Sequence, residues 1–192
     1  MNGIIHKGGI ILNKDIKIMD VTLRDGSYAN HFQFSLAQQK AITQGLEELG
    51  IEYIEIGHGM GLGASSRRNG IALHSDDEYL GMAQRTLKKA KYGMFCIPGI
   101  ATLEDIVKAH RYGADFIRVG TNVTEIEQSK PYIYKAKELG MTVMANYMKV
   151  YAVSPKIVAE QVVKSQNLGA DYVYMVDSAG CMLPKELEES SH

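Results

Sequence analysis

The stretch Leu168-Gly-Ala-Asp-Tyr-Val-Tyr-Met175 decides the fold, because close variants of it recur along the chain. The related stretches are Leu49-Gly-Ile-Glu-Tyr-Ile-Glu-Ile56, Tyr112-Gly-Ala-Asp-Phe-Ile-Arg-Val119 and Leu139-Gly-Met-Thr-Val-Met144. In each one, a glycine that can end a helix precedes a β-branched and aromatic run that favours a strand. Their spacing is typical of repeated β-α units.

The pattern predicts six parallel strands alternating with helices. The strands are expected at 17–21, 53–57, 93–97, 116–120, 143–147 and 172–176. Capping-box patterns predict helix starts at Ser35-x-x-Gln38, Ser75-x-x-Glu78, Thr102-x-x-Asp105 and Thr124-x-x-Glu127, and Ser154-Pro155 marks another. We therefore predict an α/β fold of the (β/α)8 TIM-barrel type, incomplete, with about six β/α units.

A single domain is expected over residues 1–192, with a small hairpin at about 3–13 that plugs the bottom of the barrel. A full eight-unit barrel usually takes roughly 250 residues. We therefore expect this chain to stop before the barrel closes, leaving the first and sixth strands with unpaired edges. Such edges favour association, so a homo-oligomer is among the expectations.

The composition favours a small-molecule partner. A net charge of -1 with 45% hydrophobic residues gives no basic field for nucleic acid or acidic membranes. Cys96 and Cys181 have no metal-type spacing and are expected to be reduced thiols. No signal-like or membrane-spanning apolar stretch is present, so the sequence predicts a cytoplasmic protein.

Polar side chains follow the predicted strands at the ends that meet in a parallel barrel. Arg24 and Asp25 follow the first strand, His58 the second and Ser178 the sixth. Arg118, Thr121, Asn122, Asn146, Tyr147 and Asp177 also lie at such ends. Any one of them has an ordinary structural explanation: an Arg-Asp ion pair, or a loop histidine with satisfied hydrogen bonds. Their coincidence at one mouth favours an active site.

Four motifs together resemble the 4-hydroxy-2-oxovalerate aldolases of the DRE-TIM metallolyase, or HMG-CoA lyase-like, superfamily. They are Asp20-Val-Thr-Leu-Arg-Asp-Gly26, Glu55-Ile-Gly-His-Gly-Met-Gly-Leu62, Arg118-Val-Gly-Thr-Asn-Val-Thr-Glu125 and Met175-Val-Asp-Ser-Ala-Gly180. The resemblance implies a carbon-carbon lyase of aromatic catabolism. Its expected reaction is the reversible cleavage of a 4-hydroxy-2-oxo acid, such as 4-hydroxy-2-oxovalerate, to pyruvate and an aldehyde.

The resemblance also implies roles for particular residues. Asp25 would be a ligand of a divalent metal, with Mn2+ favoured over Mg2+ or Co2+. Arg24 would be catalytic and substrate-binding, holding the keto and enolate oxygen, because its guanidinium stays charged and donates two directed hydrogen bonds. Ser178 would contact the substrate carboxylate or keto group, and His58 would lie near the pocket as a further substrate-binding residue.

The chain departs from the family pattern in two places. Tyr28 occupies the position of the family's catalytic histidine, and a phenol with an unperturbed pKa of about 10 is a poor base. Tyr28 is therefore expected to donate or relay a proton, with His31 as a substitute base. The second departure is the family's metal-binding His-x-His pair, which we do not find before His192. On this ground the chain alone is expected to be weak or inactive.

Two alternatives remain beside the aldolase. One is a non-catalytic remnant of the family, and the other is a Claisen-type acyl-CoA condensing enzyme of the same superfamily. The aldolase is favoured over the second because the contexts of His58 and Asp177 look more like the aldolases. The resemblance further implies a 2-oxo acid substrate and an acylating aldehyde dehydrogenase as protein partner.

Overall fold

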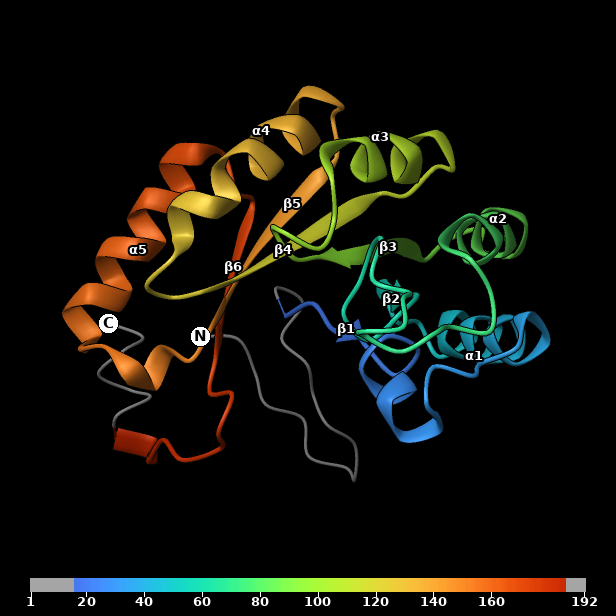
Figure 1. The fold of residues 1–192 in the computed structure, drawn as a ribbon, viewed down its shortest axis with the longest axis horizontal. Coiled ribbons are helices and arrows are strands. Elements are labelled where there is room, and N and C mark those ends of the chain that lie inside the picture. Colours follow the sequence, from blue (N-terminus) through green and yellow to red (C-terminus); the bar gives the residue numbers. More distant parts are fainter. Residues whose placement is uncertain (1–15, 186–192) are drawn as a thin grey trace, which may run out of the picture.

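The computed structural model describes residues 16–185, so the hairpin predicted at 3–13 lies outside the described residues. Six parallel strands form one sheet in the order of the chain, as predicted (Figure 1). They are β1 (Met19–Asp20), β2 (Tyr53–Ile56), β3 (Lys91–Cys96), β4 (Phe116–Asn122), β5 (Thr142–Met148) and β6 (Tyr172–Val176). Among the described residues, β1 and β6 are the two edges of this sheet.

Five α-helices connect the strands: α1 (Leu36–Glu48), α2 (Asp76–Thr86), α3 (Leu103–Arg111), α4 (Lys130–Glu138) and α5 (Pro155–Leu168). The predicted capping boxes at Ser35, Ser75 and Thr102 are confirmed, each with both reciprocal hydrogen bonds. The one predicted at Thr124 is wrong. That segment forms a 3-10 turn, η2 (Ile126–Ser129), and α4 then begins with a proline in its first turn, where the missing N–H costs nothing.

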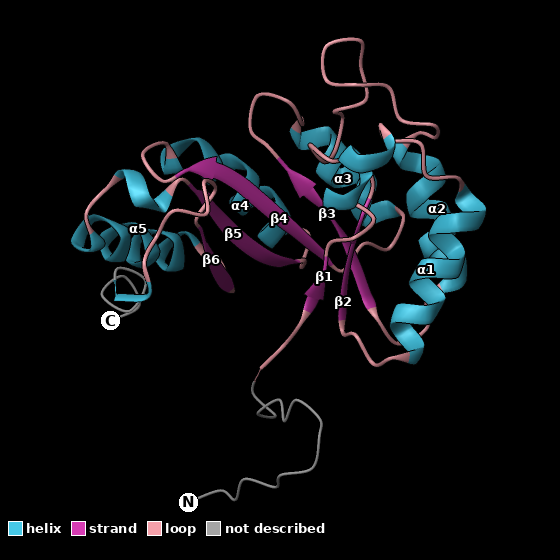
Figure 2. Cartoon of the chain, turned by 90° about the horizontal axis from the view of Figure 1, so that it is seen from below, coloured by secondary structure: helices cyan, strands magenta, loops and turns pink. Residues whose placement is uncertain are grey.

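The sheet is strongly curled, and the helices cover its convex side (Figure 2). Alternate strand residues point outward into the main core, among them Ile54, Ile56, Met94, Ile117 and Val143. The intervening residues point to the concave side, where Tyr53, Phe116 and Met144 form a smaller cluster. Within residues 16–185, six strands and the five helices that connect them form part of a TIM-type barrel, and the polar residues between these apolar positions face its interior.

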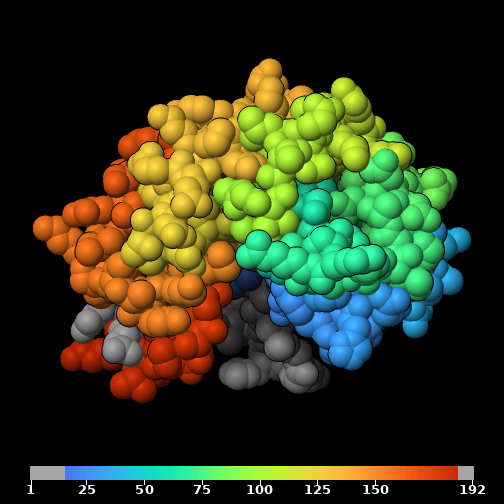
Figure 3. Space-filling view, viewed as in Figure 1, coloured from blue at the N-terminus to red at the C-terminus, as the bar shows by residue number. Residues whose placement is uncertain are grey.

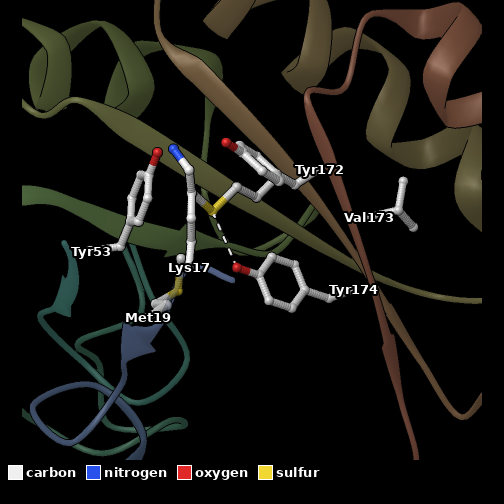
Figure 4. A pocket seen from close by; sticks show the side chains of 7 residues that line it. Lys17, Met19, Tyr53, Tyr172, Val173 and Tyr174 are labelled. Atoms are coloured by element: carbon white, nitrogen blue, oxygen red, sulfur yellow. Dashed lines mark hydrogen bonds between the residues drawn. The ribbon is translucent and has the colours of Figure 1, made fainter. Parts of the chain in front are cut away.

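At the amino-terminal ends of the strands, a cavity of about 450 Å3 opens between the two edges of the sheet (Figure 4). Its lining is aromatic and aliphatic, with one lysine: Lys17, Met19, Tyr53, Met144, Tyr172, Val173 and Tyr174. This end is opposite to the strand ends that carry the predicted site. No helix within residues 16–185 is long and apolar enough to cross a membrane.

Candidate active site

Arg24 lies just after β1, where the chain turns into the 3-10 helix η1 (Asp25–Asn30). Its guanidinium donates from Nε to Glu55 Oε2 at 2.7 Å and from Nη1 to Asp25 Oδ1 at 2.7 Å. Nη1 also reaches the carbonyl oxygen of Gly59 at 3.4 Å. With 11% of its side chain exposed, Arg24 is held in one orientation at the mouth of the curled sheet.

Glu55, on β2, is the centre of this group and is completely buried. Besides Arg24 it accepts two hydrogen bonds from Arg118 on β4, at 2.7 Å from Nε and 2.5 Å from Nη2. Arg118 in turn donates from Nη1 to Asn146 Oδ1 on β5 at 2.6 Å. Polar residues on or after β1, β2, β4 and β5 therefore meet on the concave side of the sheet, as its parallel arrangement allows.

Glu55 is not among the site residues predicted from the sequence, although it begins the motif Glu55-Ile-Gly-His-Gly-Met-Gly-Leu62. The sequence feature that could have identified Glu55 is a carboxylate inside an otherwise apolar buried strand, Tyr53–Ile56. Carboxylates are almost never fully buried unless they are paired, so Glu55 required a cationic partner in the folded protein.

The aromatic ring of Phe95, on β3, packs against the guanidinium groups of both Arg24 and Arg118. The guanidinium carbons of Arg24 and Arg118 lie 4.9 Å and 4.6 Å from the centre of its ring. Burial by itself lowers the pKa of Arg118, but the hydrogen bonds and charge of Glu55 outweigh burial and raise the pKa above its ordinary value. Both guanidinium groups thus lie within cation-π distance of the same aromatic ring.

Tyr28 lies on η1 with 48% of its surface exposed, beside Arg24 and Asp25. Burial raises the pKa of its phenol; the positive charge of Arg24 opposes this shift, and the negative charge of Asp25 adds to it. The phenol is therefore protonated at neutral pH. This state suits a proton donor or relay better than a base.

Asp25, the residue predicted to bind a divalent cation, keeps part of its carboxylate accessible. Its carboxylate is 62% exposed, and its hydrogen bond to Arg24 uses Oδ1. Carboxylate oxygens are ligands for Mg2+ and Mn2+. Within residues 16–185, however, no group of three or more histidine, cysteine or carboxylate side chains is placed to bind a metal. Asp25 fits as one ligand of such a site.

His58, predicted to contact substrate, is buried with 1% exposure. Its Nδ1 accepts the Met60 N–H at 3.0 Å, and its Nε2 lies 3.1 Å from the carbonyl oxygen of Gly70. Burial lowers the pKa of the imidazole, and the hydrogen bond to Gly70 only partly offsets that effect. Both ring nitrogens are thus engaged by backbone groups, and the predicted substrate contact stays a prediction.

Ser178 lies after β6 on the exposed rim of the sheet. Its Oγ accepts the N–H of Lys149 at 3.0 Å, and Lys149 has a left-handed backbone with φ of 59°. Ser178 therefore joins the ends of β5 and β6. In the described part of the chain, no hydrogen bond links it to Arg24, so its predicted role in substrate binding remains a prediction.

Comparison with solved structures agrees with the architecture. The N-terminal domain of a Bacteroides vulgatus protein superposes with a TM-score of 0.74 at 24% identity, covering 92% of this chain and 60% of that one. The carboxyl transferase domain of Rhizobium etli pyruvate carboxylase gives a TM-score of 0.76 at 15% identity, covering 93% and 33%. At these identities the likeness concerns the fold alone.

Comparison of sequences identifies the family. A 4-hydroxy-2-oxovalerate aldolase from Moorella thermoacetica is 42% identical over 175 residues, which cover 91% of this chain and 52% of the relative. One from Brevibacillus brevis is 39% identical over 178 residues, covering 93% and 52%. The chain thus spans about half the length of these curated relatives. The profile of the HMGL-like family matches residues 15–191, and the chain belongs to the HMGL-like family.

Proposed function

We propose that this chain carries the enolate-binding part of an aldolase that cleaves 4-hydroxy-2-oxo acids, such as 4-hydroxy-2-oxovalerate, to pyruvate and an aldehyde. The observation that carries the proposal is the position of Arg24, fixed by Glu55 at the mouth of the sheet. Identity of about 40% to proteins named 4-hydroxy-2-oxovalerate aldolase supports this choice of substrate.

In the proposed reaction a base takes the proton of the C4 hydroxyl, and the bond between C3 and C4 breaks. The C4 oxygen becomes the aldehyde carbonyl, and the electron pair passes into the enolate of pyruvate. Protonation at C3 then completes pyruvate. Arg24 stabilises the developing charge on the C2 oxygen, because a preorganised guanidinium needs no reorientation when that charge appears.

Tyr28 is proposed to deliver or relay a proton in this sequence, since its phenol is protonated and lies next to Arg24 and Asp25. His31, the next titratable residue along the segment, remains the alternative base. His31 is exposed and has a left-handed backbone, with φ of 56°. Ser178 is proposed to bind the substrate carboxylate or keto oxygen from the β6 side.

A divalent cation is proposed to bind through Asp25, with Mn2+ as the first choice. When bound, such a cation would polarise the keto group of the substrate. An acylating aldehyde dehydrogenase is proposed as the protein that takes up the aldehyde product, because free aldehydes react with exposed amines and thiols. Both proposals rest on the likeness to the aldolases.

The function is tested by incubating the full chain with 4-hydroxy-2-oxovalerate and Mn2+ and measuring pyruvate with lactate dehydrogenase and NADH. Pyruvate formation that disappears in Arg24→Ala supports the proposal. Pyruvate formation that is the same in this variant would contradict the assigned role of Arg24. If the chain alone forms no pyruvate, as its weak expected activity allows, the proposal is tested by the binding of pyruvate, and equal affinity in the wild type and Arg24→Ala would contradict it.

A further inference from the structure

The segment that carries Arg24 and Tyr28 ends in a strained backbone. His31 and Phe32 both lie in the left-handed region, with φ of 56° and 65°. Non-glycine residues in this region are strained and persist only where the surrounding structure holds them. The Phe32 N–H donates to the carbonyl oxygen of Ser27 at 2.7 Å, which closes the segment back on itself.

The ring of Phe32 holds this strained segment against the loop between β2 and α2. It stacks on the imidazole of His58, with ring centres 3.9 Å apart and planes inclined by 21°. Two glycines leave room for it: a Cβ at Gly59 would lie 2.9 Å from Phe32 Cε1, and one at Gly70 would lie 2.2 Å from Cε2. The backbone of this loop therefore forms a slot that fits the Phe32 ring.

His58 holds the two sides of the slot together. Because Nδ1 accepts the Met60 N–H, the imidazole proton sits on Nε2 and is donated to the Gly70 carbonyl. The neutral side chain of His58 thus joins backbone groups on both sides of the slot. Its imidazole ring also stacks on the ring of Phe32. The segments 20–35 and 57–75 lie side by side on the surface (Figure 3), and the Leu73 N–H donates to the Phe32 carbonyl at 3.1 Å.

The slot is connected directly to the proposed site. Gly59 accepts from Arg24 Nη1 through its carbonyl, and its α-carbon packs against the ring of Tyr28, where a Cβ would lie 2.6 Å from Cε2. Tyr28 also meets the ring of Phe32 edge to face, with centres 5.2 Å apart. A shift of Phe32 out of the slot would therefore displace both Tyr28 and Arg24.

We propose that Phe32 and His58 are positioning residues that clip the β1–α1 segment to the β2–α2 loop and so hold Arg24 and Tyr28 in place. The catalytic consequence rests on the proposed function, whereas the clip itself does not depend on it. His58 has on this view no direct contact with substrate. Its role is to present an aromatic face and two hydrogen bonds to the protein.

The test uses Phe32→Leu in the full chain and follows the exchange of arginine Nε–H protons by 15N NMR. Arg24 and Arg118 both donate from Nε to Glu55, so Arg118 serves as an internal reference. Loss of the clip should accelerate exchange at Arg24 about tenfold and leave Arg118 unchanged. Equal acceleration at both arginines, or none at Arg24, would overturn the proposal.

Two further variants make the result specific. Phe34→Leu is the matched control, because Phe34 packs on the main core from the same segment; it should leave Arg24 exchange unchanged. His58→Phe keeps the stacked face but removes both hydrogen bonds, and should accelerate exchange at the Met60 amide and at Arg24 Nε–H. An unchanged Arg24 in His58→Phe would overturn the role of His58 even if Phe32→Leu does not fold.

Catalysis gives a separate measurement. Phe32→Leu should lower kcat about tenfold with KM within about twofold of the wild type, because Arg24 acts mainly on the transition state. An unchanged kcat beside accelerated Arg24 exchange would overturn the catalytic consequence of the clip. The exchange measurement decides whether the clip exists, whether or not the wild-type chain alone has lyase activity.

Discussion

Arg118 and Glu55 form a two-point ion pair inside the curled sheet, with Nε and Nη2 of the arginine 2.7 Å and 2.5 Å from the two carboxylate oxygens. They lie 63 positions apart in the sequence, on β4 and β2. The same carboxylate holds Arg24 at 2.7 Å, so one buried anion orients two cations. In the proposed reaction, Arg24 held in this way would meet the developing negative charge.

Glu55→Gln is expected to destabilise the protein strongly. The amide cannot neutralise two guanidinium groups that are 11% and 8% exposed, and breaking a buried ion pair on one side costs roughly 3–5 kcal/mol. Urea denaturation at pH 7 measures the loss. Glu52→Gln is the control: its carboxylate is exposed and pairs with Lys17 and Lys91 at the surface, so the change should stay within about 1 kcal/mol.

Tyr28→Phe is expected to lower turnover of a 4-hydroxy-2-oxo acid by about 100-fold with little change in KM, because it removes only the phenolic hydroxyl group that delivers or relays the proton. Burial raises the pKa of Tyr28, so wild-type activity should fall only above pH about 10, where the phenol loses its proton. The variant should lack this alkaline fall. Tyr134→Phe, on the exposed face of α4, should behave as wild type, and a Tyr28→Phe enzyme of full activity would exclude Tyr28 from the reaction.

Asp76→Asn is expected to change how stability depends on pH. Burial raises the pKa of this carboxyl from 3.8 to about 6; Asp105 and Asp77 add to the increase, while the Gly63 N–H and Lys108 oppose it. The folded state therefore binds the proton more tightly than the unfolded state, and stability falls as the pH rises through 6.

The asparagine variant cannot ionise, so its free energy of unfolding should exceed that of the wild type by roughly 2–3 kcal/mol at pH 7 and by less than about 1 kcal/mol at pH 4. Its side-chain oxygen still accepts the Gly63 N–H, which Asp76 accepts at 2.8 Å. Thermal unfolding between pH 4 and 8 measures the difference. A constant difference across this range would show that the charge of Asp76 is not responsible.

Two glycine-to-alanine substitutions should change the free energy of unfolding in opposite directions. A Cβ at Gly93 on β3 would lie 2.2 Å from the carbonyl oxygen of Phe116, and Gly93→Ala should cost about 2–3 kcal/mol by overpacking between β3 and β4. At Gly45, inside α1, a Cβ meets nothing within 4 Å, so Gly45→Ala should add about 0.5–1 kcal/mol. Denaturant midpoints of both variants test the packing, and a stabilised Gly93→Ala would contradict the strand register.

Local signals account for the parts of the fold that could be predicted. Capping boxes at Ser35, Ser75 and Thr102 begin helices because their hydrogen bonds lie within four residues of sequence. Prediction failed at Thr124, because α4 begins only at Lys130, with Pro131 in its first turn. Thr124-x-x-Glu127 has the right residues, but the backbone there forms a 3-10 turn, so no cap is made.

The sequence by itself determined the order of strands and helices, and it placed Arg24 and Asp25 at the end of β1. These outcomes follow from residue propensities and from the parallel connection of successive strands, which act over short stretches of chain. Only the tertiary structure decided that Glu55 joins Arg24 to Arg118 and that His58 uses both nitrogens on the backbone. Buried charges and polar groups take whichever partner the folded chain brings within hydrogen-bonding distance, because leaving them unpaired costs several kcal/mol.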